Sequence, residues 1–185
     1  PIHLITHVET VLAPTQDVEV CTTIYADMER QDLKPRTHIV DAGYVSANLL
    51  AQAAEGDGIE LVGPVTKLQD VSWQAREQTG YDLTQFGIDW DRKQVTCPHG
   101  NTSSRWNENA KDSTGNAVIH VAFAASICGA CSARAACTRS KQGGRAMQFR
   151  PRAQYEALQR ARAEQNDDAF KRRYRIRLGI EGTIS

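Results

Sequence analysis

Asp41 is the first residue whose type and position could serve chemistry. It follows the strand-like run His38-Ile39-Val40 and precedes Ala-Gly-Tyr. A carboxylate placed there projects from the carboxyl edge of a sheet, where α/β proteins usually bind their ligands. The simpler alternative is that Asp41 caps the helix expected to begin near Val45, or bonds its own turn.

A second set of candidate residues lies close to the C-terminus. Tyr174, Arg177 and Glu181 are spaced by three and then four residues, which places them on one face of a helix. A carboxylate beside cationic and phenolic donors could hold a divalent metal ion and bind a phosphate. The alternative is a surface salt bridge between Arg177 and Glu181 at i, i+4.

Four of the five cysteines predict a third kind of site. They follow the spacing C-x30-C-x2-C-x5-C, which suits a structural Zn²⁺ ion closed by four thiolates: Cys97, Cys128, Cys131 and Cys137. His99 is an alternative fourth ligand. The other interpretations are free thiols in a reducing compartment or disulfides in an oxidising one. Cys21 is expected to be a small buried side chain.

The elements that must position Asp41 alternate along the first part of the chain. We expect strands over 3–11, 37–43 and 59–65, and helices over 16–32 and 46–54. This order indicates an α/β sheet with parallel crossovers, so residues 1–65 are predicted to begin the core. The histidines His3, His7, His38 and His120 are interpreted as ordinary sheet residues.

Residues 66–150 change in character, with short strand-like stretches over 86–90, 94–97 and 118–123 separated by Gly, Asn, Asp and Ser. We expect a small β-rich insertion that contains the cysteines. Its three tryptophans are predicted to form the apolar centre of the insertion rather than to stack on DNA bases. Helical patterns return over 151–165 and from 169 onward, so residues 151–185 are predicted to supply the last helices of the core.

Composition and charge narrow the class of protein. The 185 residues are 41% hydrophobic and 24% charged, which argues against a disordered chain or a coiled coil, and no apolar run approaches the roughly 18 residues of a membrane span. The net charge of zero hides a segregation. Residues 1–133 hold 9 basic and 17 acidic side chains, whereas residues 134–178 hold 13 basic and 4 acidic ones. This pattern favours a polyanion-binding surface, with a solvated helix face as the alternative.

The stretches HIVDAGYVSANLL and RYRIRLGIEGTIS resemble the DDE transposases of bacterial insertion sequences. The resemblance implies an RNase H-like mixed sheet with flanking helices, interrupted by the insertion. Asp41 matches the second catalytic aspartate in its V-D-x-G-Y context. Tyr174, Arg177 and Glu181 match the signature Tyr-x2-Arg-x3-Glu-x6-Lys.

The resemblance also implies a mechanism and partners. Asp41 and Glu181 would hold Mg²⁺ or Mn²⁺ for cleavage and strand transfer of DNA phosphodiesters. The DNA backbone would be bound by Lys171, Arg173, Tyr174 and Arg177. Transposon ends and target DNA are the expected partners, with a homodimer in the DNA complex, no membrane association, and a cytoplasmic, nucleoid-associated location in a bacterium.

The family pattern also includes a first aspartate, expected before Pro1, and a lysine expected at position 188. We therefore expect a chain truncated at both ends and inactive by itself. The alternative function is a non-catalytic DNA-binding remnant with a structural zinc module. A stand-alone RNase H-like nuclease of another specificity is a third hypothesis.

Overall fold

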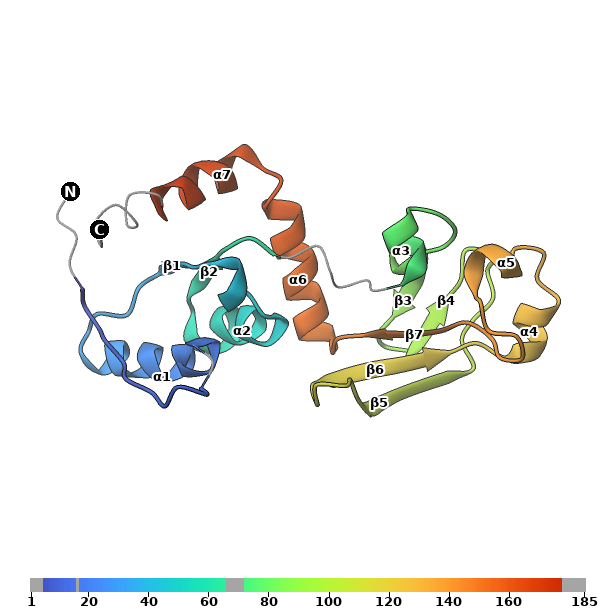
Figure 1. Cartoon of the computed structure of the whole chain (residues 1–185), viewed down its shortest axis with the longest axis horizontal. Helices are drawn as coiled ribbons and strands as arrows, with labels where there is room; N and C mark the ends of the chain where they lie inside the picture. Colours follow the sequence, from blue (N-terminus) through green and yellow to red (C-terminus); the bar gives the residue numbers. More distant parts are fainter. Residues whose placement is uncertain (1–4, 16, 66–71, 178–185) are drawn as a thin grey trace. The chain divides into compact units, whose positions relative to one another are not determined.

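The computed structural model of the chain describes residues 5–15, 17–65 and 72–177. The chain divides into two compact units, the first formed by residues 1–66 and 153–185 and the second by residues 67–152. Figure 1 shows the helices and strands of both units along the chain. Within the described ranges, no helix combines the length and the apolar character needed to cross a membrane.

The first unit has a small parallel sheet and helices from both ends of the chain. Its elements are α1 (Asp17–Arg30), β1 (Thr37–Ile39), a 3-10 turn (Ala42–Tyr44), α2 (Ala47–Gln52) with a π-helical extension (Ala53–Asp57), β2 (Glu60–Val62), α6 (Arg152–Glu164), α7 (Asp168–Tyr174) and a final 3-10 turn (Arg175–Arg177). Pro151 directly precedes α6, where its fixed φ suits the start of a helix. The mixed α/β class predicted from the sequence is confirmed.

Strands β1 and β2 run parallel, with Thr37, His38 and Ile39 opposite Glu60, Leu61 and Val62. The pairing continues one step further, because the Val40 amide donates to the Val62 carbonyl over 2.9 Å. Gly63 allows this close approach. A Cβ atom at position 63 would lie 2.8 Å from the Val40 carbonyl oxygen and 2.6 Å from a Val45 methyl carbon. Gly63 therefore packs directly against the backbone that leads to Asp41.

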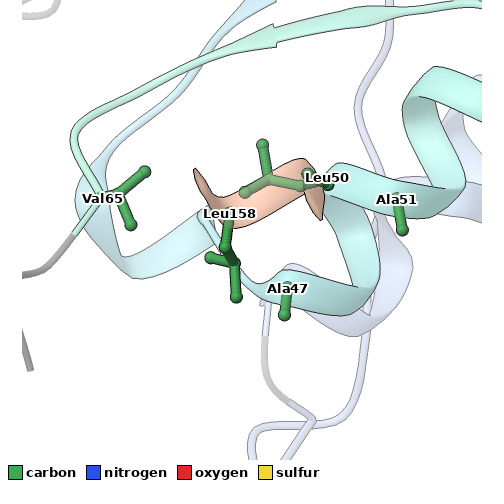
Figure 2. Packing of buried hydrophobic residues seen from close by; sticks show 6 residues of the cluster. Ala47, Leu50, Ala51, Val65 and Leu158 are labelled. Atoms are coloured by element: carbon green, nitrogen blue, oxygen red, sulfur yellow. The ribbon is translucent and has the colours of Figure 1, made fainter. Parts of the chain in front are cut away.

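Two apolar clusters hold the first unit together. In one, Leu158 of α6, 1% exposed, packs against Leu50 and Val65 together with three small residues, Ala47, Ala51 and Ala157 (Figure 2). The other joins α1 to the segment around α2 through Cys21, Tyr25, Leu49, Ala53 and Ile59. Cys21 is 3% exposed, so its predicted role as a small buried side chain is confirmed.

The strand predicted over 3–11 is wrong where the structure describes it, because residues 5–12 have no regular secondary structure. The β-branched composition of this segment favours a strand only when a neighbouring strand accepts its hydrogen bonds and one face is buried. Neither holds within the described residues. Ile5, Val8 and Leu12 are 86%, 75% and 78% exposed, and the only parallel sheet described is the β1–β2 pair.

The second unit is the β-rich part of the chain. Its elements are α3 (Trp73–Glu77), a 3-10 turn (Leu83–Gln85), β3 (Gly87–Asp89), β4 (Gln94–Thr96), β5 (Arg105–Lys111), β6 (Ala117–Ala122), α4 (Ala125–Gly129), α5 (Arg134–Cys137) and β7 (Ala146–Phe149). Strands β3 and β4 form an antiparallel hairpin, and β5, β6 and β7 form an antiparallel sheet in that order.

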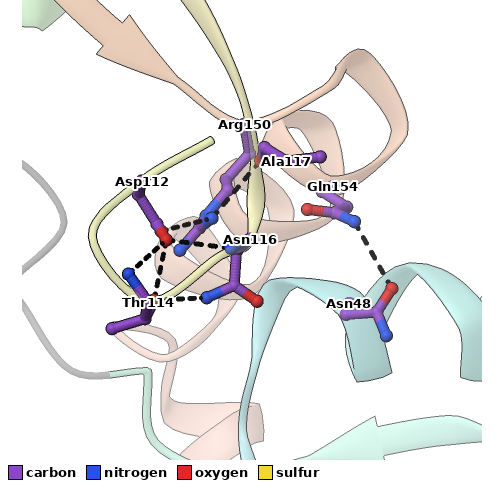
Figure 3. A network of polar contacts seen from close by, with 7 residues as sticks. All are labelled: Asn48, Asp112, Thr114, Asn116, Ala117, Arg150 and Gln154. Carbon is purple, nitrogen blue, oxygen red and sulfur yellow. Dashed lines mark hydrogen bonds and ion pairs between the residues drawn. The ribbon is translucent and has the colours of Figure 1, made fainter. Parts of the chain in front are cut away.

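Polar contacts fix the turn between β5 and β6. The Asp112 carboxylate accepts hydrogen bonds from Thr114 and from the Asn116 amide, and it pairs with Arg150 at 2.9 Å (Figure 3). These donors hold the pKa of Asp112 well below its usual range, with the Thr114 hydroxyl as the largest cause. In the first unit, the Gln154 amide of α6 donates to the Asn48 side chain of α2 over 3.3 Å, also drawn in Figure 3.

Several aromatic side chains of the second unit contact one another. The rings of Trp90 and Trp106 each meet Phe149 edge-on, with centroids 5.5 and 5.4 Å apart. The predicted role of tryptophan in the apolar centre therefore holds for these two. Trp73 has a different environment, because the Arg139 guanidinium lies 4.2 Å above the centre of its ring.

We predict that Gly63→Ala lowers the free energy of unfolding by about 1–3 kcal/mol, because the added methyl group forces the Val40 backbone away from β2. Urea denaturation followed by far-ultraviolet circular dichroism measures the change. Gly56→Ala is the matched control, since a Cβ atom there meets nothing within 4 Å. Equal stability of the two variants would contradict the close contact.

Candidate active site and cysteine cluster

Asp41 lies two residues beyond the end of β1, immediately before the 3-10 turn of residues 42–44. Its side chain makes no capping hydrogen bond to that turn. Helix α2 is capped instead by Ser46, whose hydroxyl oxygen accepts from the Leu49 amide over 3.1 Å. The capping alternative for Asp41 is therefore wrong, and its carboxylate serves a contact elsewhere.

That contact is with Arg177, 136 positions further along the chain. The Arg177 Nη2 donates to Asp41 Oδ2 over 2.6 Å. The Arg177 side chain is 25% exposed and that of Asp41 48% exposed, so the pair lies at the surface with one side open to solvent. The end of the last described helical segment thus meets the end of β1, and two of the residues matched to the transposase motifs are in direct contact.

A second arginine of the same helical segment pairs with β2. Arg173 donates from both terminal nitrogens to the two carboxylate oxygens of Glu60, which also accepts from the Thr37 hydroxyl over 3.1 Å. The hydrogen bond from Arg173 is the largest cause of a lowered pKa for Glu60. Sequence reasoning missed Glu60, since no motif marks it. Its place beside Thr37 follows from the parallel register of β1 and β2, which the sequence does not specify.

The other predicted DNA contacts have neighbours within α7. Lys171 pairs with Asp168 at 2.9 Å, one turn away, and both side chains are well exposed. The ring of Tyr174 stacks on Phe170 with an angle of 9° between their planes. Arg172 and Arg175 are exposed and lie on the same segment. The C-terminal segment therefore presents cations to solvent in addition to the two arginines that pair with the sheet.

Glu181 lies outside the described residues. Its predicted metal ligation stays a prediction, as does the alternative salt bridge with Arg177. The structure does show that Arg177 has a carboxylate partner on the sheet, Asp41.

Helix α1 supports the strand that leads to Asp41. The Tyr25 hydroxyl, in a side chain 1% exposed, hydrogen bonds to His38 Nδ1 over 2.8 Å, and the two rings meet edge-on. Burial lowers the pKa of His38. His38 is a strand residue, as predicted, and the contact fixes β1 against α1.

One group of potential metal ligands was missed by the sequence analysis. His7, Glu9 and Asp27 each offer a ligand atom, and these atoms lie within 4.8 Å of one another. His7 is not in a strand, so its interpretation as a sheet residue is wrong. The i, i+2 spacing of His7 and Glu9 was the available signal. Because Asp27 is also ion-paired with Arg30, the group has a cation already beside it.

The four predicted metal-binding cysteines line a single cavity of about 20 Å³ in the second unit. Cys97 follows β4, Cys128 belongs to α4, and Cys137 ends α5, with Cys131 between the two helices. All four are half-buried and none forms a disulfide. His99, Tyr81, Phe86 and Phe123 also line the cavity. Burial raises the pKa of the Cys137 thiol, and the other three cysteines add to that effect whereas Arg145 opposes it.

Comparisons with known proteins identify one family. Residues 96–185 match the family model described as transposase DDE domain. The match begins next to Cys97 and includes Tyr174, Arg177 and Glu181, whereas Asp41 precedes it. No curated protein and no solved structure matches the chain.

We predict that Arg173→Gln raises the pKa of Glu60 toward its ordinary value, because the variant removes the largest cause of the lowering. Carboxyl-carbon NMR titration measures it, with Lys171→Gln as the control. A lowered pKa in the folded state stabilises the protein above the ordinary glutamate pKa, and this contribution is lost as the pH falls through the lowered value. The stability difference between wild type and Arg173→Gln should therefore disappear in acid. A Glu60 pKa unmoved by the substitution would contradict the pairing.

Proposed function

Because residues 96–185 match the transposase DDE domain model, we propose that the chain forms part of a transposase catalytic core that cleaves and joins DNA phosphodiesters with a divalent metal ion. Asp41 and Glu181 are the proposed metal ligands. The proposed core is RNase H-like, with the β1–β2 pair as part of its sheet and α6 and α7 among its flanking helices.

The single observation that carries this proposal is the contact between Arg177 and Asp41. The two residues come from separate motifs 136 positions apart, and the fold brings their side chains into direct contact. This contact is what a shared site built from both motifs requires. Arg177 and Glu181 are four residues apart in the sequence, as in the family signature, and the proposed role of Glu181 beside Asp41 rests on this spacing.

The residues around Asp41 fit a hard divalent cation. The Asp41 carboxylate is 48% exposed, is not used in helix capping, and offers the oxygen ligands that Mg²⁺ and Mn²⁺ prefer. A bound ion of this kind supplies Lewis-acid stabilisation of the charge that develops on a phosphate oxygen. Arg177 orients the Asp41 carboxylate through Oδ2, and its guanidinium is also the group best suited to a bidentate contact with phosphate.

The C-terminal segment supports binding to the DNA backbone. Arg172 and Arg175 are exposed, and Lys171 is 59% exposed although it pairs with Asp168. Such cations bind phosphates without reading the base sequence, and each one engaged makes affinity more dependent on salt. Arg173 contributes by holding α7 against β2 and so fixes the direction in which the neighbouring cations point.

The proposal extends to the state of the active enzyme. The family chemistry uses three acidic residues, and Asp41 and Glu181 are the two matched in this chain, so we propose that the 185-residue chain alone binds DNA without cutting it. We also propose that the complex with paired transposon ends is a homodimer.

We predict that Mg²⁺ tightens the binding of the chain to a short DNA duplex, as measured by fluorescence anisotropy at constant ionic strength, and that Asp41→Asn removes this response. Without Mg²⁺, Asp41→Asn should bind at least as tightly as the wild type, because the substitution removes a negative charge beside the DNA phosphates. Glu60→Gln is the matched control, since it also removes a carboxylate of the sheet but one that is bonded to Arg173. It should keep the response to Mg²⁺.

The same titrations separate the proposed function from its alternative. Equal responses to Mg²⁺ in the wild type and in Asp41→Asn would favour a DNA-binding module without a catalytic metal. Failure of the wild-type chain to bind DNA at all would contradict the proposed function as a whole.

A separate prediction concerns the exposed cations. The double substitution Arg172→Gln and Arg175→Gln should reduce the slope of log affinity against log salt by about 2, which corresponds to two phosphate contacts. Anisotropy titrations at several salt concentrations measure the slope. Gln replacements at Arg92 and Arg105, two arginines of the second unit, are the control and should leave it unchanged. A slope unaffected by the α7 substitutions would remove this segment from the DNA interface.

A further inference from the structure

We propose that Cys97, Cys128, Cys131 and Cys137 bind one structural Zn²⁺ ion through four thiolates. The four residues come from separate segments of the second unit, yet all of them line one cavity. This site is independent of the proposed DNA-cleaving chemistry, because four protein ligands close the tetrahedral shell of zinc and leave no position for substrate.

Tight backbone turns lie next to the proposed ligands Cys97 and Cys131. After β4, the chain reverses at Cys97-Pro98-His99-Gly100, where the Gly100 amide donates to the Cys97 carbonyl over 2.9 Å and Gly100 has φ +78°. At the second pair of ligands, the Cys131 amide donates to the Cys128 carbonyl over 3.3 Å. Both are tight turns next to a proposed ligand, and the cysteines of both turns line the same cavity.

Polar contacts position two of the proposed ligands. The Arg145 amide donates to the Cys128 sulfur over 3.4 Å, a contact that fixes the place of this sulfur at the cavity wall. The Cys137 carbonyl accepts from the side chains of Gln74 and Arg145, each over 2.7 Å. Gln74 and Arg145 are 1% and 8% exposed, so these are buried contacts that hold the end of α5 in place.

The loop before β3 also packs closely on α5. The Tyr81 amide donates to the Ala136 carbonyl over 3.2 Å, and a Cβ atom at Gly80 would lie 2.2 Å from the same oxygen. The Cys137 end of the cavity is thus held by segments on two sides, and a metal ion would join it to the β4 turn and to α4.

The sulfur atoms of the four cysteines are further apart in this structure than in a zinc-bound site. Zn–S bonds of about 2.3 Å place the sulfurs of a tetrahedral site about 3.8 Å apart. No three of the four sulfurs lie within 4.8 Å of one another. Binding of one ion therefore requires the four sulfurs to move closer together around the cavity that they already share.

His99 is assigned outside the ligand shell. Its Nε2 hydrogen bonds to the Tyr81 hydroxyl over 3.1 Å, and the two rings meet edge-on. His99 lines the cavity with this hydrogen bond already made, so the fourth ligand is assigned to a thiolate.

The test is metal analysis of the full 185-residue chain purified without added zinc. We expect about one zinc per chain in the wild type and near zero after Cys97→Ser or Cys131→Ser. Cys21→Ala is the matched control, since this cysteine is buried in the first unit, and it should retain the metal, as should His99→Ala. Zinc loss in His99→Ala with retention in Cys97→Ser would overturn the four-thiolate assignment.

Two further measurements keep the proposal testable if a cysteine variant fails to fold. Titrating the wild-type protein with an organomercurial should release zinc in step with the modification of four thiols. Substitution by Co²⁺ should give strong thiolate-to-cobalt charge-transfer absorption and tetrahedral d–d bands. Absence of metal from the folded wild-type protein, or mass-spectrometric detection of disulfides among the four cysteines, would overturn the proposal.

Discussion

The ion pair between Arg177 and Asp41 is the constraint on which the candidate active site depends. It joins the end of a strand to the end of a helical segment 136 positions later, across the whole of the second unit in the sequence. Its strength is modest, because both side chains are partly exposed and such pairs contribute up to about 1 kcal/mol. Its importance is geometric. Together with the pair formed by Arg173 and Glu60, it sets the rotation of the described C-terminal segment about its axis.

Much of the candidate site could be predicted from the sequence because it depends on local patterns. The strand that precedes Asp41 and the helical run after Pro151 are each encoded within a few residues. What failed was the strand expected over 3–11. Its residue types are those of a strand, but strand formation is decided by a partner, and propensity carries no information about the partner.

Contacts between distant residues were beyond sequence reasoning. Glu60 has no motif, and its role as the partner of Arg173 follows from the parallel register of β1 and β2. Asp41 could equally have been a helix cap. That alternative fails because Ser46, a better-placed hydroxyl, caps α2 instead. The grouping of His7, Glu9 and Asp27 likewise depends on how residues 5–12 lie against α1.

The second unit shows a different balance of forces. Its strands are short, and aromatic rings gather around Phe149. Around the cysteines, α4 and α5 have only five and four residues and have too few apolar side chains to dock firmly by themselves. A metal ion is a common way to hold such small elements, since metal binding energy replaces the missing burial. The proposed zinc ion therefore stabilises the fold of the second unit and takes no part in the proposed DNA cleavage.

The central claim is that Asp41 and the C-terminal segment form one divalent-metal site. Paramagnetic broadening by substoichiometric Mn²⁺ in backbone-amide NMR spectra of the chain tests it most directly. We expect resonances of residues 41–44 and 174–177 to broaden together in the wild type, and to remain sharp in Asp41→Asn. Broadening confined to His7, Glu9 and the neighbouring residues of α1, or identical broadening in both proteins, would contradict the claim.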